Sequence, residues 1–211
     1  MIREFGIVRD AAARVAGAAE RVTGALREGR VEQEPAFTDR MLGAIEGAMH
    51  DYQAKGISWS AKTLTDRGPN AQERQHGADF MGVLSIDLPA FTVKKGFLAQ
   101  AKLIEPGGWV SKDEFERMKA QCERMLSRTP DSFVFLYARA GVTIVPAISI
   151  LSSERCNPHE FYSRSISRFY EEHFESFIGD RRLHAPTPGV LDEIRRDLDA
   201  RSLLYLEAHF A

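Results

Sequence analysis

The sequence predicts an α/β domain, and three patterns lead to that class. Apolar side chains recur at intervals of three and four near both ends of the chain, which is typical of amphipathic helices. The middle of the chain instead carries alternating or continuous apolar runs bounded by Gly and Pro, which indicates strands. Between two groups of these runs, a Ser-x-x-Glu sequence predicts the start of another helix. The 211 residues are enough for one such domain with a sizeable core.

The first half of the chain is expected to form two helices and then a strand meander. The N-terminal helix ends near Gly29, and the second helix carries Pro35 in its first turn, so Glu34 lies at its start. A polar loop marked by Gly and Pro covers residues 67–77. The helices are expected over 4–28 and 36–54, and the strands over 57–64, 80–88 and 91–104, with a break near 94–96.

The second half is expected to add a helix, two buried strands and two further helices. The runs SFVFLYA and VTIVPAISI are apolar and rich in β-forming residues, although Pro146 favours an edge or a bulge in the second. The helices are expected over 112–126, 158–178 and about 190–206, and the strands over 132–138 and 142–150. A single domain, 1–211, would then consist of an N-terminal helix (1–30), a core (32–151) and C-terminal helices (157–211).

Composition argues against several classes of protein. The chain is 44% hydrophobic and 27% charged, and no apolar run approaches the roughly 20 residues that a membrane-spanning helix needs. The N-terminus lacks the apolar core of a signal peptide, and the two cysteines are far apart, so we expect a cytoplasmic protein with reduced thiols. A net charge of −2 argues against a protein that coats nucleic acid non-specifically, whereas a local basic patch would suffice for an enzyme that cuts it.

The most informative polar residues gather around the predicted hairpin of residues 79–104. Asp79 opens its first strand. Gln100 and Lys102 are two residues apart in its second strand, so they share one face while Ala101 points to the other. The alternative is an amphipathic strand with one solvated face. We favour the interpretation that a carboxylate, an amide oxygen and an ammonium converge there, because this set can hold a divalent cation and a water beside a phosphodiester.

The expected ligands of this site are oxygen atoms, which Mg²⁺ prefers in proteins. Asp79 would be the central ligand, Gln100 would offer its amide oxygen, and Ala101 would offer its backbone carbonyl. Glu34 would supply a second carboxylate, although Glu32 competes for this role and the helix dipole alone favours a glutamate at a helix start. Lys102 would orient or help deprotonate the attacking water and offset charge on the phosphate.

These residues resemble the motif of the PD-(D/E)xK nuclease superfamily. The matching features are the acid at the start of one strand, the Q-x-K sequence in the next, and the upstream helical glutamate. The Q-x-K form, the sequence GAD at 77–79 and the helix start EPAFTDR at 34–40 are similar to Mrr-like nucleases and to nuclease domains of bacterial anti-phage defence. The helix and two strands around 121–147 are similar to the segment that follows the active-site hairpin there. The resemblance covers about residues 32–151.

The resemblance implies a restriction-endonuclease-like core, with a mixed four- or five-stranded sheet flanked by helices and extra helices at both termini. It further implies cleavage of DNA with Mg²⁺ or Mn²⁺, leaving a 5′-phosphate and a 3′-hydroxyl. The commoner motif has Glu at the position of Gln100, so this site carries one negative charge fewer and depends more on Glu34.

The setting that the resemblance implies is an effector subunit in anti-phage defence. Grip on DNA would come from a homodimer or from a regulatory or recognition protein, and the residues expected to contact nucleic acid are Arg74, His76, Lys94 and Lys95. One alternative is a catalytically weak or inactive subunit of the same fold, which acts in the assembly of a defence complex. Another is an enzyme that cuts RNA with the same site.

Overall fold

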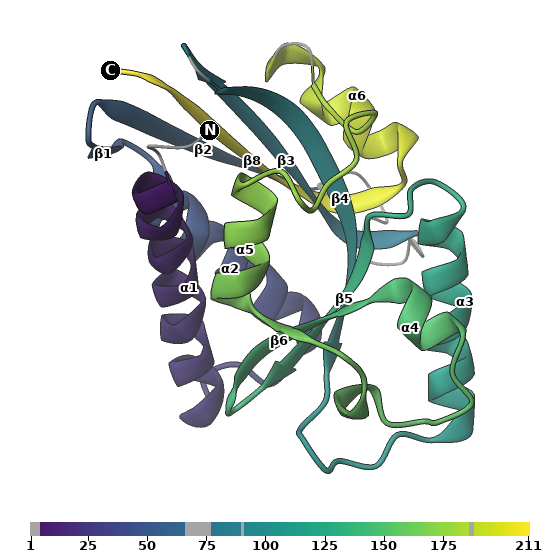
Figure 1. Ribbon diagram of the computed structural model, residues 1–211. Coiled ribbons are helices and arrows are strands. Elements are labelled where there is room, and N and C mark those ends of the chain that lie inside the picture. The colour runs from purple at the N-terminus through teal and green to yellow at the C-terminus, as the bar shows by residue number, and fades with distance from the viewer. Residues whose placement is uncertain (1–4, 66–76, 90, 186–187) are drawn as a thin grey trace.

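The computed structural model describes residues 5–65, 77–89, 91–185 and 188–211 (Figure 1). Within these residues the chain forms six α-helices and one mixed eight-stranded sheet. The predicted α/β class is confirmed. The expected sheet of four or five strands is wrong, because short edge strands and a C-terminal strand enlarge it.

The described elements have the following bounds. The helices are α1 (Phe5–Arg27), α2 (Glu34–Met49), α3 (Lys112–Leu126), α4 (Ala147–Leu151), α5 (Ile166–Phe174) and α6 (Leu191–Asp197). The strands are β1 (Tyr52–Ala54), β2 (Ile57–Thr65), β3 (Ala78–Leu88), β4 (Phe91–Leu103), β5 (Ser132–Ala138), β6 (Gly141–Pro146), β7 (Arg164–Ser165) and β8 (Ala200–Phe210).

The sheet has the strand order β1-β2-β8-β3-β4-β5-β6-β7. The pairs β3–β8 and β4–β5 are parallel, and the other neighbours are antiparallel. The last strand, β8, therefore lies in the middle of the sheet, between β2 and β3. The start of β3, the start of β8 and the end of β4 consequently meet at one end of the sheet.

Helices cover both faces of the sheet, and each face has its own apolar core. On one face α1, α2 and α5 cover the sheet, and Phe169 of α5 packs against Phe97 and Phe135 of the sheet, with ring centroids 5.0 to 6.2 Å apart among the three. On the other face α3, α4 and α6 pack over Leu98 and Val134 (Figure 1). Side chains alternate between the two faces along a strand, so the nearly continuous burial of β3, β4 and β5 shows that both faces of these strands are covered.

One helix and one interior strand have the bounds that the sequence predicts. The helix α3 has the predicted bounds, and the hydroxyl oxygen of Ser111 accepts a hydrogen bond from the N–H of Glu114 at 3.1 Å. The strand β5 also has its predicted bounds, and all seven of its residues are buried. The expected break in the third strand is wrong, because β4 runs without interruption from Phe91 to Leu103.

The C-terminal part differs most from the prediction. The helix expected over 190–206 ends at Asp197, and residues 200–210 form β8 instead. Leu203 to Leu206 are all buried, and a short apolar run of this kind fits a buried helix and a buried strand equally well. The helix expected over 158–178 shrinks to α5, and the strand expected over 142–150 ends at Pro146, where α4 begins. The C-terminal region is thus not purely helical.

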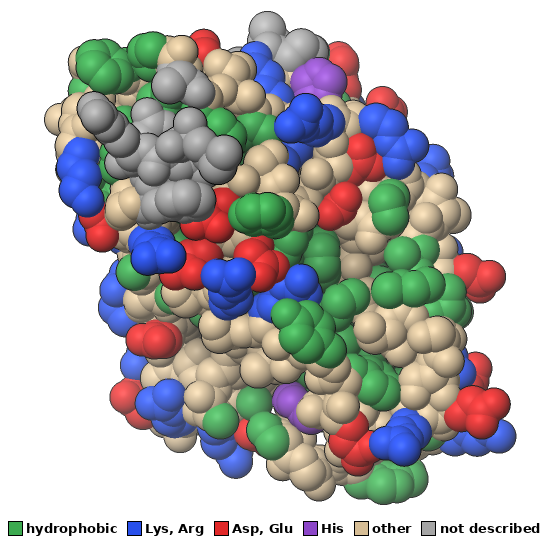
Figure 2. Space-filling view, viewed as in Figure 1, with side chains coloured by type: hydrophobic (Ala, Val, Ile, Leu, Met, Phe, Trp, Pro, Cys, Tyr) green, Lys and Arg blue, Asp and Glu red, His purple; other side chains and the backbone are tan. Residues whose placement is uncertain are grey.

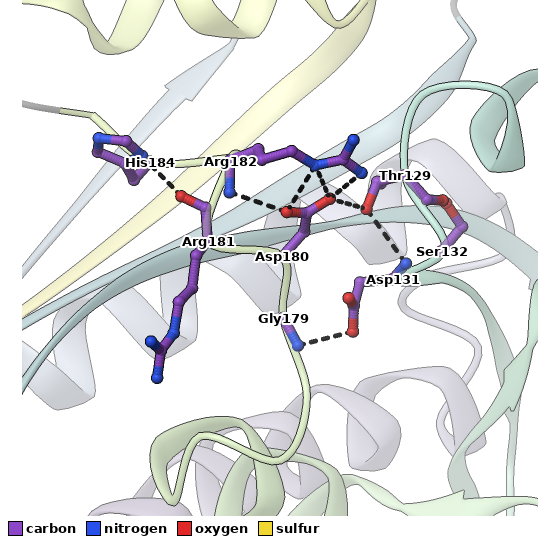
Figure 3. Close-up of polar contacts among 8 residues, drawn as sticks. All are labelled: Thr129, Asp131, Ser132, Gly179, Asp180, Arg181, Arg182 and His184. Carbon is purple, nitrogen blue, oxygen red and sulfur yellow. Dashed lines mark hydrogen bonds and ion pairs between the residues drawn. The ribbon is translucent and has the colours of Figure 1, made fainter.

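A loop packs beside the middle of β4, about six residues before Lys102. Asp180 exchanges two backbone hydrogen bonds with Gly96, and so takes the place that β5 would fill if it began earlier. The side chain of Asp180 accepts hydrogen bonds from Thr129 at 2.8 Å and from Arg182 (Figure 3). The N–H of Gly179 donates to Asp131 at 2.7 Å. These contacts hold the loop against the sheet. In the described parts of the chain no helix has the length and apolarity that crossing a membrane requires.

Candidate active site

The structure brings together the four side chains that the sequence selects as a site. They lie at the end of the sheet where β3 begins and β4 ends. The pairing of Phe80 with Ala99 places Asp79 level with Gln100 across the two strands. The amide nitrogen of Gln100 donates a hydrogen bond to Oδ2 of Asp79. Glu34, at the first position of α2, lies 3.5 Å from the ammonium of Lys102, measured between Oε1 and Nζ.

The end of β4 explains why both carboxylates sit where they do. The pairing of β3 with β4 ends at Phe80 and Ala99, so the N–H groups of Ala101 and Leu103 need acceptors other than the backbone of β3. The N–H of Ala101 donates to Oδ2 of Asp79 at 2.7 Å, and the N–H of Leu103 donates to Oε2 of Glu34 at 3.1 Å. The two carboxylates therefore continue the hydrogen-bond ladder of β4, which fixes their positions.

Burial disfavours the ionised form of both carboxyl groups. It raises the pKa of Asp79 above its ordinary value, against the opposing effects of the Ala101 N–H and of the nearby Lys102 and Arg201 charges. Burial also raises the pKa of Glu34; the Lys102 charge opposes this shift and the Asp79 charge adds to it. A divalent cation between the two groups would favour their charged forms, because its charge would offset both the desolvation and the mutual repulsion.

Gln100 has one polar atom without a partner. Its side chain is 1% exposed, and its amide oxygen, Oε1, has no hydrogen-bond partner among the described residues. An unpaired buried acceptor is unfavourable, so a donor or a cation next to this oxygen would stabilise the arrangement. The amide nitrogen thus orients Asp79 and leaves Oε1 available to a ligand, and the role of this oxygen as a metal ligand stays a prediction.

The donor set consists of hard oxygen atoms. Two carboxylates and one amide oxygen are available, and the carbonyl of Ala101 points to the same edge of β4 as its N–H, which bonds to Asp79. Among the described residues no group of three or more His, Cys, Asp or Glu side chains is placed to hold a metal ion. The set fits a cation such as Mg²⁺, which binds through one or two carboxylates and keeps several waters, better than Zn²⁺.

Three side chains around the site were not selected from the sequence. Arg201, on β8, lies close enough to Asp79 for its charge to oppose the rise in the pKa of that carboxyl, and its guanidinium is 2.9 Å from Oδ2 of Asp39. The buried hydroxyl of Tyr137 is 3.1 Å from that of Thr38, one turn after Glu34. Arg201 was missed because its segment was assigned to a helix. Once residues 200–210 are recognised as a strand, a charged residue between the buried Ala200 and Ser202 indicates a candidate for the site.

The expected nucleic-acid contacts are placed differently from the site. Lys94 and Lys95 lie inside β4, at the place where the sequence predicted a break in the strand. Lys94 is exposed, whereas Lys95 is 0% exposed and cannot reach a ligand on the surface. Eight residues of extended chain, about 26 Å, separate Lys94 from Lys102. Arg74 and His76 lie outside the described residues.

Comparison with known proteins adds no assignment. No protein-family model, curated protein or solved structure matches the chain. On the face shown in Figure 2, acidic and basic side chains are interleaved, in keeping with the net charge of −2. The case for a function therefore rests on the residues of the site.

Proposed function

We propose that this chain is a metal-dependent nuclease that hydrolyses DNA phosphodiester bonds with Mg²⁺ or Mn²⁺. One observation carries the proposal: Asp79, Glu34 and the unpaired oxygen of Gln100 converge beside the ammonium of Lys102 at one end of a hairpin. This convergence joins residues from α2, β3 and β4, which are far apart in the sequence, and it places anionic ligands next to a cation that could contact phosphate.

Each residue has a role that its contacts support. Asp79 and Glu34 would hold the metal ion, with the carbonyl of Ala101 and the amide oxygen of Gln100 completing the protein side of the coordination. The bound ion would lower the pKa of a water and offset charge on the phosphoryl oxygens. Lys102, 17% exposed in its side chain and 3.5 Å from Glu34, would donate a hydrogen bond to that water and favour its ionised form, while the proton of the water passes to solvent. Attack on phosphorus with departure of the 3′-oxygen leaves a 5′-phosphate and a 3′-hydroxyl.

A second candidate is a subunit of the same fold with little or no catalytic activity, acting in the assembly of a defence complex. The neutral side chain of Gln100 favours it, because the site has two carboxylates where the commoner motif supplies a third. In this case the convergence at the sheet end would be a structural remnant. Three further parts of the proposal rest on the resemblance alone. They are the setting in anti-phage defence, the dimer or regulatory partner, and RNA as an alternative substrate to DNA.

The experiment compares the native protein with Gln100→Glu and Lys102→Ala on end-labelled DNA and RNA in Mg²⁺ and in Mn²⁺. A nuclease is expected to cut one of these substrates, to leave 5′-phosphate ends, to retain or gain activity in Gln100→Glu, and to lose it in Lys102→Ala. Equal cleavage by the native protein and Lys102→Ala would refute the proposed site. Absence of cleavage by the native and Gln100→Glu proteins alike, with or without cell extract, would favour the assembly subunit.

A further inference from the structure

We propose that Arg201 binds the scissile phosphate of the substrate, and that Asp39 occupies its guanidinium until the substrate arrives. This inference rests on the proposed nuclease function and extends it to a fifth side chain, from the C-terminal strand.

Arg201 lies level with the proposed metal ligands. In the parallel pair β3–β8, Ala78 is opposite Ala200 and Phe80 is opposite Ser202, so Asp79 and Arg201 are at the same level. Side chains at one level of adjacent strands point to the same face. Gln100 lies level with Asp79 on the other side. Arg201, Asp79 and Gln100 therefore form a row across three adjacent strands, β8, β3 and β4, with Lys102 two residues further along β4.

The present partner of Arg201 is an exchangeable one. Its Nη2 lies 2.9 Å from Oδ2 of Asp39, and the two side chains are 26% and 44% exposed. An ion pair with this much exposure contributes little to stability, typically about 0–1 kcal/mol. A phosphate can therefore replace Asp39 without a large loss of stability. Asp39 belongs to α2, the same helix that supplies Glu34, so the pair also keeps the arginine at the site.

An arginine suits this position chemically. Its planar guanidinium can donate two parallel hydrogen bonds to the oxygens of one phosphate, which a lysine cannot do. A metal ion held by Asp79 and Glu34 would contact the phosphate from one side, and Lys102 lies beside it. Arg201, at the level of Asp79 and one strand away, would contact the phosphate from the opposite side. The phosphate would then be bound by Arg201, by Lys102 and by the metal ion.

The test measures kcat and KM for DNA cleavage in Mg²⁺ or Mn²⁺ for three variants. Arg201→Ala is expected to raise KM about tenfold or more, as for the loss of one charged hydrogen bond, and Arg201→Lys to restore part of it. Asp39→Ala is expected to lower KM, because the carboxylate no longer competes with the phosphate. Arg201→Ala should also reduce the slope of log KM against log salt concentration by about 0.9, the value for one lost phosphate contact.

The control is Arg182→Ala, which removes an exposed arginine from its ion pair with Asp180; Asp180 pairs with Gly96 near the middle of β4, about 20 Å along the strand from Lys102. Opposite changes of KM in Arg201→Ala and Asp39→Ala, with Arg182→Ala unchanged, would support the inference. Equal changes in the same direction would show a structural ion pair and overturn it while leaving the nuclease intact. Failure of the native protein to cut DNA or RNA would overturn the nuclease function and the inference together.

Discussion

Replacing Lys95 with methionine is expected to stabilise the fold at neutral pH. The ammonium of Lys95 is completely buried and has no hydrogen-bond partner among the described residues. Burial lowers the pKa of this group to about 7, against the opposing charge of Asp131. Methionine has a similar length and no charge, so the substitution removes the desolvation cost and keeps most of the packing.

The size of the effect follows from the difference in pKa between the folded and unfolded chains. A free lysine has a pKa of 10.5, and the folded value is about 7. Between these values the unfolded chain binds a proton that the folded chain does not, so the free energy of unfolding rises with pH. Each pKa unit corresponds to about 1.4 kcal/mol, so the charged amine lowers stability by an amount on the order of 5 kcal/mol below pH 7.

The assay is urea unfolding of the native protein and Lys95→Met at pH 7, 8 and 9. The difference in the free energy of unfolding is expected to be largest at pH 7 and to shrink by about 1.4 kcal/mol per pH unit. This window lies above the range in which His173 titrates, since burial lowers the pKa of that imidazole to about 3. The exposed neighbour gives the control: Lys94→Met should show a small difference at every pH. A Lys95→Met protein that is less stable at every pH would refute the reasoning.

Three further predictions concern the loop, the sheet and the site. Asp180→Asn should lower the free energy of unfolding at pH 7 and not at pH 2. Hydrogen bonds from Arg182 hold the pKa of Asp180 at about 2, so the stabilisation by the ionised carboxylate is lost as the pH falls through that value. Acid unfolding of both proteins, followed by circular dichroism, measures the difference. Gly96→Ala should destabilise the fold by about 1–3 kcal/mol in urea unfolding, because a Cβ there would lie 2.6 Å from a backbone oxygen and 2.8 Å from another. Asp79→Ala should abolish the rise in melting temperature that Mg²⁺ or Mn²⁺ gives the native protein, and an unchanged rise would remove Asp79 from the site.

The sequence predicted the elements whose local pattern is unambiguous. A capping residue and a strict apolar spacing gave α3 its bounds, and the two-residue alternation of Gln100 and Lys102 placed both on one face of β4. The proximity of Asp79 to Gln100 followed from the pairing of two consecutive strands in one hairpin. The contact between Glu34 and Lys102 followed from the family resemblance and not from the pattern, because 68 residues separate them in the sequence.

The parts that were not predicted depend on long-range packing. The position of β8 between β2 and β3 is set by pairing with strands more than 100 residues away, and its apolar run does not by itself distinguish a strand from a helix. Arg201 was missed for the same reason. The burial of Lys95 was not predicted because lysine is seldom buried, and because the loop around Gly179 and Asp180 that packs against it is distant in the sequence.

The central claim is that Asp79 and Lys102 form a metal-dependent nuclease site. The most direct measurement is the cleavage of supercoiled plasmid DNA with Mg²⁺, with Mn²⁺ and with EDTA, by the native protein, Asp79→Ala, Lys102→Ala and the control Lys62→Ala on the exposed part of β2. We predict nicking by the native and Lys62→Ala proteins that requires the metal ion and is lost in both site variants. Metal-dependent nicking that persists undiminished in Asp79→Ala and Lys102→Ala would contradict the assignment of this site.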